Sequence, residues 1–171
     1  AGAHCVMHTH TTAGVAVACV QGGLQQTNFY SAQLHNMVAY HDFEGITIHA
    51  EEAPRLLRSI GNKQAVILRN HGLLAWGHTL PQTFAVLWTL QRACEIQLAT
   101  LSMGQPIAVP EAIADQCTRD ALQFNRTTAR AKMFFNRWCA KSTGKTKGGA
   151  HESLYLRRWR HWRLDRDAPG T

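Results

Sequence analysis

The sequence predicts a single α/β domain in which strands alternate with helices in layers. Its 171 residues, 45% of them hydrophobic, are enough for one domain with its own core. Apolar runs of strand length lie between segments whose apolar residues recur at helical spacing. This ordinary globular composition excludes a fibrous or wholly disordered protein.

The first predicted strand is HCVMHTH, residues 4–10. Its period of two places His4, His8 and His10 on one face. The following stretch, TTAGVAVACVQGG, predicts a short helix that begins at a threonine cap and ends at the glycine pair 22–23. The chain therefore opens with a strand followed directly by a helix.

Five further segments continue this alternation. Residues 31–38, SAQLHNMV, predict another short helix, and residues 45–50, GITIHA, predict a strand. Residues 51–61, EEAPRLLRSIG, predict an amphipathic helix that closes at glycine. The runs at 65–68 and 73–76 are apolar throughout and predict two strands joined by a polar corner, Arg-Asn-His-Gly.

Two helices are expected in the remainder of the domain. The first spans residues 79–101, where apolar side chains follow helical spacing. Those side chains are Phe84, Leu87, Leu90, Cys94, Leu98 and Leu101. The second starts at Pro110, a residue suited to a first helical turn.

The charge of the chain divides it into two parts. Residues 1–130 contain eight Lys or Arg and eight Asp or Glu, whereas residues 131–171 contain ten and three. We therefore expect a domain at 1–137 and a basic, disordered tail at 138–171. An Arg and Trp cluster in this tail has the composition of a nucleic-acid binder. An unrelated extension or a changed reading frame also produces such an abrupt change of composition and explains it better, so we do not expect nucleic acid as a partner.

The cysteines and the hydropathy indicate a cytoplasmic protein. Five scattered cysteines, never spaced C-x-x-C, form neither a disulfide framework nor a zinc ribbon and fit a reducing compartment. No segment reads as a signal peptide. The longest apolar run, residues 83–101, contains Arg92 and Glu95 and does not qualify as a membrane span.

Three histidines have the pattern of a metal site. His8 and His10, two residues apart on a strand, would lie about 6–7 Å apart at the backbone, so that both rings can reach one ion. His71 stands in the polar corner beside Gly72 and supplies a third imidazole at a strand end. Three such ligands with one open position are what a catalytic zinc ion requires.

Three stretches of the chain resemble the class II aldolase and adducin family. They are HTHTTAGVAVACVQGGL, VAYHDFEGI and AVILRNHGLLAWGHTLPQTF with the long helix after it, and the likeness covers residues 4–137. The resemblance implies a three-layer α/β/α sandwich with a mainly antiparallel central sheet. It also implies that His8, His10 and His71 bind a divalent metal, usually zinc.

The resemblance further implies a chemistry. Family enzymes act on small hydroxy-carbonyl sugars or sugar phosphates, by carbon–carbon cleavage or epimerisation through an enediolate, and commonly form tetramers. A glutamate before the H-x-H pair serves as acid and base, and residues 1–7 hold no acid. The resemblance therefore implies that this chain is the C-terminal part of a family domain and that it lacks this glutamate and the phosphate-binding loops, which lie upstream in the family. The alternative is a non-catalytic, adducin-like assembly module.

No acid or base is assigned from the sequence. Tyr30 and Tyr40 are candidates for the tyrosine that family aldolases use as proton donor, although Tyr40 also suits a structural role. His41 beside Asp42 is either an acid–base pair or part of a turn. A replacement carboxylate is sought in Glu44, Glu51 and Glu52, of which the last two also suit a helix start. His35, His49 and His78 have no partner at useful spacing.

Overall fold

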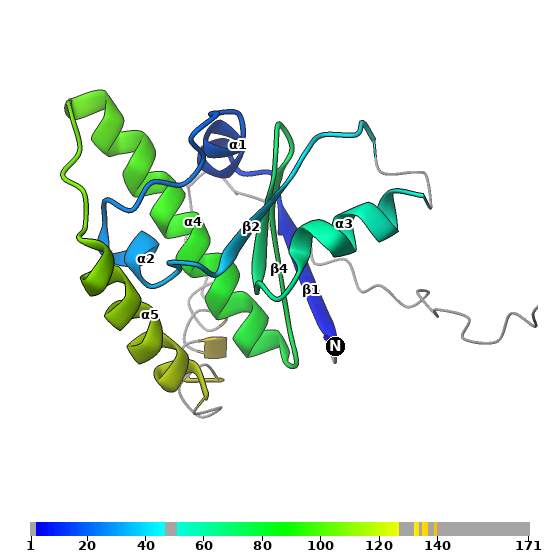
Figure 1. Ribbon diagram of the computed structural model, residues 1–171. Helices are drawn as coiled ribbons and strands as arrows, with labels where there is room; N and C mark the ends of the chain where they lie inside the picture. The colour runs from blue at the N-terminus through cyan, green and yellow to red at the C-terminus, as the bar shows by residue number, and fades with distance from the viewer. Residues whose placement is uncertain (1–2, 47–50, 127–131, 134, 137–138, 140–171) are drawn as a thin grey trace, which may run out of the picture.

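The structure is a computed structural model that describes residues 3–46, 51–126, 132–133, 135–136 and 139. The predicted tail at 138–171 lies outside the described residues, apart from Cys139. The elements, shown in Figure 1, are β1 (Cys5–Thr9), α1 (Thr12–Ala18), α2 (Phe29–Ala32), β2 (Val38–His41), α3 (Glu52–Ile60), β3 (Ala65–Leu68), β4 (Gly72–Gly77), α4 (Leu80–Met103) and α5 (Glu111–Arg126).

Four strands form one mixed sheet in the order β1-β4-β3-β2. The pairs β1–β4 and β4–β3 are antiparallel, and β2–β3 is parallel. Helices α1, α2, α4 and α5 lie on one side of the sheet and α3 on the other (Figure 1). The predicted layered fold with a mainly antiparallel sheet is confirmed, and one parallel pair makes the sheet mixed.

The main core lies between the sheet and helices α1 and α4. Strand β3 is buried at every residue because helices cover both of its faces. Its alternate side chains Ala65 and Ile67 face this core. The other buried members are Met7, Ala13, Val17, Ala18, Leu34, Leu73, Ala75, Phe84, Val86, Leu87, Leu90 and Cys94. This packing fixes β1 and β4 against α4.

A smaller core lies on the opposite face, under α3. Val66 and Leu68 of β3 join Ala39 of β2 there, and Leu56 of α3 packs against them. Helix α3 ends at Gly61, whose φ of 53° suits glycine, as the sequence predicts. The second core therefore holds α3 and β2 together.

The region between α1 and α3 differs from the sequence prediction. The predicted helix at 31–38 begins earlier, at Phe29, because Asn28 and Ser31 form a capping box. Strand β2 then takes Val38–His41, where no strand was expected. The predicted strand at 45–50 lies mostly outside the described residues, and residues 45–46 form a bend. Helix α1 ends at Ala18, before the glycine pair 22–23.

Gln97 connects α4 to the segment after α1. Its side chain is 1% exposed, donates to the Gly23 carbonyl at 2.8 Å and accepts from the Gln25 N–H at 2.7 Å. Replacing Gln97 by leucine is expected to lower the free energy of unfolding by about 2–4 kcal/mol, because two backbone groups lose their partner. Denaturant unfolding measures this loss. The control Gln123→Leu, on the exposed side of α5, should cost less than about 0.5 kcal/mol.

Candidate metal centre

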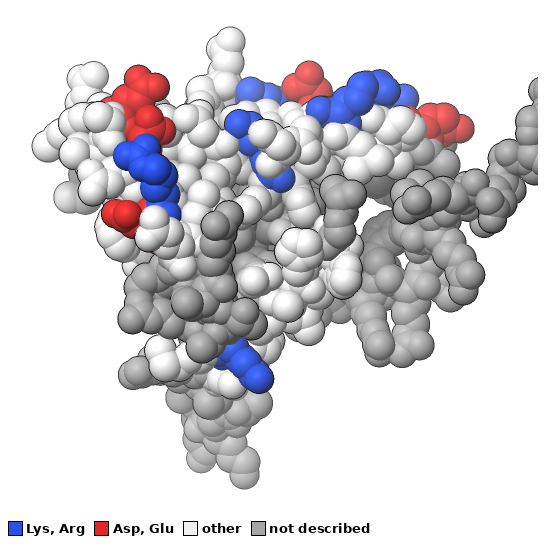
Figure 2. All heavy atoms as spheres, turned by 60° about the horizontal axis from the view of Figure 1, so that its bottom comes forward, with Lys and Arg blue, Asp and Glu red and all other residues white. Residues whose placement is uncertain are grey.

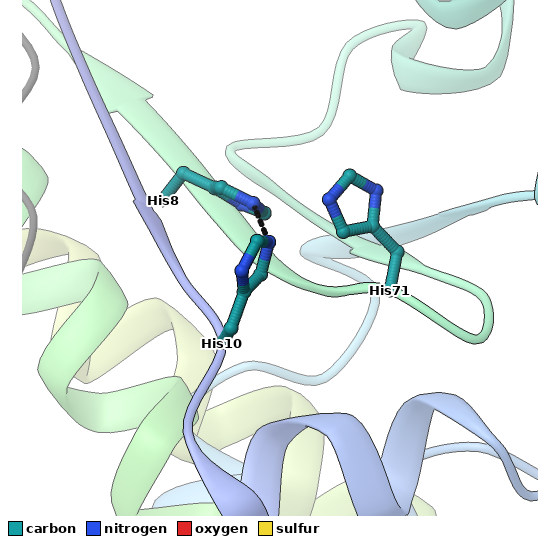
Figure 3. Close-up of side chains that lie close together, drawn as sticks. All are labelled: His8, His10 and His71. Carbon is teal, nitrogen blue, oxygen red and sulfur yellow. Dashed lines mark hydrogen bonds between the residues drawn. The ribbon is translucent and has the colours of Figure 1, made fainter. Parts of the chain in front are cut away.

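The three predicted ligands lie together at one end of the sheet. His8 belongs to β1, His10 follows that strand directly, and His71 precedes β4. One ring nitrogen from each histidine lies within 4.8 Å of the others. The three rings point toward a common space, as Figure 3 shows. The structure thus brings together residues that are far apart in the sequence.

The His8 ring is fixed by the strand beside it. Its Nδ1 lies 2.8 Å from the Leu73 carbonyl oxygen, which can only accept, so Nδ1 carries the hydrogen. The other nitrogen, Nε2, then presents its lone pair and lies 2.5 Å from Nε2 of His10. A hydrogen bond from the ring nitrogen that does not bind the ion sets the tautomer that metal ligation needs. His8 is therefore oriented as a ligand.

A strained corner places His71. Asn70 has a φ of 56°, in the left-handed region that asparagine tolerates better than most residues. Its N–H donates to the Ala18 carbonyl at 3.1 Å, and the His71 N–H donates to Leu68 at 3.1 Å. These bonds tie the corner to α1 and to β3. The Asn-His-Gly corner predicted from the sequence is thus what turns the His71 ring toward β1.

The backbone of His10 is held by the cap of the next helix. Thr11 is the N-cap of α1, and its hydroxyl accepts from the Gly14 N–H at 3.2 Å. The same hydroxyl lies 2.6 Å from Oε1 of Gln91 in α4 and donates to it. The residue after the ligand is therefore anchored to two helices, which limits the movement of His10.

Burial keeps two of the imidazoles neutral. The pKa of His8 falls from 6.5 to about 4, mainly because burial disfavours the charged ring and also because His10 and His71 lie near it. Burial and His10 also lower the pKa of His71, while the Glu52 carboxylate acts in the opposite direction. Neutral imidazoles offer the lone pairs that a metal ion binds.

Both candidate tyrosines are engaged in packing. The Tyr40 hydroxyl accepts from the Leu24 N–H at 2.9 Å, and the Arg69 guanidinium lies 4.8 Å from its ring centre. Burial raises the pKa of Tyr40. Tyr30 packs edge-on against Trp88 of α4, with ring centres 5.6 Å apart. These contacts favour the structural role for Tyr40, and a proton-donor role for either residue stays a prediction.

Three histidines outside the centre, His4, His35 and His78, each lie close to another side chain. His4 contacts His78, with ring centres 6.0 Å apart. His35 lies 3.5 Å from the Asp115 carboxylate, a pairing across distant segments that the sequence could not indicate. His49 lies outside the described residues.

An acid–base pair of His41 with Asp42, one of the two alternatives that the sequence left open, is not formed. Asp42 is 92% exposed and lies 3.5 Å from Nε of Arg69. Nε2 of His41 instead faces Glu44 and Glu52. Asp42 follows the end of β2, and its side chain lies in solvent, whereas the His41 ring is buried. The sequence singled out His41 and both glutamates, but not their contact with one another.

The surface shown in Figure 2 carries both signs of charge. Blue and red side chains alternate across it, and the described residues form no single basic patch on this face. Within the described part of the chain, no helix combines the length and the hydropathy needed to cross a bilayer.

Several known proteins resemble this chain in sequence. The family described as Class II Aldolase and Adducin N-terminal domain matches residues 1–98. A Pseudomonas aeruginosa protein whose name assigns it to aldolase class 2 is 43% identical over 100 residues, which are 58% of this chain and 39% of that protein. Mouse alpha-adducin is 42% identical over 106 residues, which are 61% of this chain and 14% of adducin.

Solved structures of two proteins resemble the structure of this chain. An aldolase II superfamily protein from Pseudomonas syringae superposes with a TM-score of 0.73 and 32% identity, over 81% of this chain and 57% of that one. L-fuculose 1-phosphate aldolase from Glaciozyma antarctica superposes with a TM-score of 0.62 and 23% identity, over 79% and 53% of the two chains, and this likeness concerns the fold. The chain spans less than half the length of the bacterial relatives it matches. On the family match to its first 98 residues, the chain belongs to the class II aldolase and adducin family.

Proposed function

We propose that His8, His10 and His71 bind zinc or another divalent ion and that the protein is a class II aldolase-type enzyme. The observation that carries this proposal is the convergence of three ring nitrogens within 4.8 Å at the strand ends. The donor set fits the ion, because three imidazoles are common zinc ligands and leave a fourth position open. The fixed tautomer of His8 supports the same reading.

The proposed substrate is a small hydroxy-carbonyl sugar or sugar phosphate, cleaved or epimerised through an enediolate. A zinc ion bound there would supply the Lewis acid that polarises the substrate carbonyl. The three histidines hold that ion, and the Leu73 carbonyl keeps the His8 ring oriented. Phe43 is 54% exposed and its ring centre lies 6.2 Å from that of His71, so it offers the substrate an apolar wall.

Assembly and location complete the proposal. Sugar-phosphate aldolases of this family commonly form homotetramers, and we propose self-association for this protein. We also propose that it is a soluble cytoplasmic protein. Tyr30 and Tyr40 remain the candidate proton donors, and no described residue is assigned as the acid or base that works beside the metal.

A second candidate function is a non-catalytic assembly module like the head of adducin. The specific support is the 42% identity with mouse alpha-adducin over 106 residues. Reading the coding sequence upstream of Ala1 separates the two. An acidic residue and glycine-rich phosphate loops there favour the enzyme, and their loss favours the module.

Zinc titration of the unaltered chain tests the proposed centre. We expect one zinc ion per chain and a melting temperature that rises with zinc concentration, because a ligand that binds only the folded state stabilises it. The zinc-loaded product of the whole coding sequence, with any residues encoded upstream of Ala1, is then incubated with L-fuculose 1-phosphate and related sugar phosphates, with chromatographic detection of cleaved or epimerised products. Zinc binding without any product would favour the adducin-like module. A chain that binds no zinc would contradict both the centre and the enzyme.

A further inference from the structure

Strand β2 is the last strand of the sheet, and its outer edge pairs with no other strand of the described chain. The carbonyls of Met37 and His41 accept N–H groups of β3 and of the residue after it, at 3.3 and 2.8 Å. Backbone groups of successive strand residues point to opposite edges, so those of Val38 and Tyr40 point away from β3. No described residue bonds to these outward groups. The edge therefore offers N–H donors and carbonyl acceptors to another chain.

A hollow of about 200 Å³ lies beside this edge and is lined in part by Val38 and Tyr40. Two polar atoms of residues in its wall, Oε1 of Gln26 and Nε2 of His35, are buried and form no hydrogen bond with the described part of the chain. Pockets that enclose a drug-sized ligand measure about 300–1,000 Å³. The hollow is smaller than that, whereas a strand laid along an open edge needs no enclosed cavity.

A cation stands at the end of the hollow where β2 begins. The ammonium of Lys63, a half-buried residue of the wall, donates to the Asn36 carbonyl at 2.8 Å and is held there by that bond. No carboxylate of the described residues forms an ion pair with it. An ammonium has three donors, so Lys63 keeps hydrogens and an uncompensated charge for an anion.

The edge also ends at this cation. Asn36 has a φ of 60°, and the chain turns away from the sheet directly before β2. A strand added to β2 would find no further backbone groups to pair with beyond Val38. A chain that stops there would bring its terminal carboxylate to the ammonium of Lys63. Such a chain would run antiparallel to β2.

We propose that the outer edge of β2 binds the carboxyl-terminal residues of a partner protein as an added strand, with the terminal carboxylate on Lys63. Main-chain hydrogen bonds supply the affinity in complexes of this kind, and the charge at the end selects a free carboxyl terminus. The site does not depend on the proposed metal centre. Val38 pairs with Ala65 at the start of β3, whereas His71 follows the end of that strand.

The competing explanation of Lys63 is protection of the edge. Lysine beside a free edge strand discourages pairing with other chains, because its charge must stay in water. The two explanations predict opposite effects of Lys63→Gln. If Lys63 protects the edge, its loss strengthens the binding of an added strand. If Lys63 receives the carboxylate, its loss weakens that binding.

Two-dimensional NMR of the isotope-labelled chain tests the proposal with the peptide N-acetyl-Val-Thr-Val-Thr-Val. Main-chain bonds do not depend on the side chains, so one extended sequence serves as the probe. The amide signals of Val38 and Tyr40 should shift on titration, because these N–H groups gain acceptors. The same peptide with an amidated carboxyl terminus should bind at least about fivefold more weakly, because it loses the charge-assisted bond to Lys63.

Three variants assign this preference to one residue. Lys63→Gln should abolish the difference between the two peptides, and Lys63→Arg, which keeps the charge, should retain it. The control is Lys132→Gln, an exposed lysine that does not line the hollow, and it should behave as wild type. The basic residues after position 138 are the same in all four proteins, so their attraction for anions does not affect the comparison. Thermal unfolding verifies that each variant is folded.

Three results would overturn the inference. If neither peptide shifts the amides of Val38 and Tyr40, the edge does not accept a strand. If both peptides bind wild type equally, or if Lys63→Gln binds them more tightly, Lys63 protects the edge and receives no carboxylate. If acetate at the same concentration causes the shifts that the peptide causes, the hollow is a site for a small anion only.

Discussion

Replacing His71 by alanine is expected to weaken zinc binding at least about a hundredfold. Changes in the outer shell of a metal site typically cost about 10- to 100-fold in affinity, and loss of a direct ligand costs more. His8 and His10 would remain, but two imidazoles from one strand cannot replace the third side of the site. The His71 ring enters from the β3–β4 corner, which no other predicted ligand occupies.

Metal analysis after dialysis measures this effect. Wild type should retain about one zinc per chain and His71→Ala essentially none at the same free zinc concentration. The control is His78→Ala, an exposed histidine beyond the end of β4 whose ring contacts His4. Zinc retained by His71→Ala, or lost equally from the control, would contradict the site assignment.

Replacing Gly72 by valine should separate β1 from β4 and destabilise the fold by about 2–3 kcal/mol or more. A Cβ at this position would lie 2.4 Å from the Thr9 carbonyl oxygen and 3.0 Å from Cδ2 of His10. The nearest atom belongs to backbone and cannot rotate away. Strand β1 must move, and both ligands that it carries move with it.

Denaturant unfolding and zinc titration of Gly72→Val test this expectation together. Both stability and zinc affinity should fall, because one shift disturbs the sheet and the site. Gly22→Ala is the control, since a Cβ at Gly22 meets no atom within 4 Å. A Gly72→Val variant with unchanged stability would show that β1 does not pack against this corner as described.

The segments with unambiguous apolar patterns were predicted correctly. Strands β3 and β4 lie on the runs at 65–68 and 73–76, and α4 begins after Thr79 as the cap and helical spacing indicate. Strand β2 escaped prediction because VAYH is short and its pairing with β3 is parallel and non-local. A four-residue run with polar members carries no clear period.

The candidate site, too, was predicted only in part. The three ligands could be named because their spacing and the Asn-His-Gly corner are local features of the sequence. The arrangement of His41 and Glu52 could not, because it depends on β2 pairing with β3 and on α3 packing under both. His41 next to Asp42 suggested a partner, but the Asp42 side chain lies in solvent beyond the end of β2.

The pairing of β1 with β4 also bears on how the chain folds. His8 and Leu73, which share a hydrogen bond, are 65 residues apart in sequence, whereas β2, α3, β3 and β4 follow one another closely. Contacts that close long loops form late because their entropy cost must be met first. The metal ligands sit on both sides of that closure. Docking of the first strand is therefore the step that completes the centre, and an ion bound there would stabilise a contact between segments that are distant in the sequence.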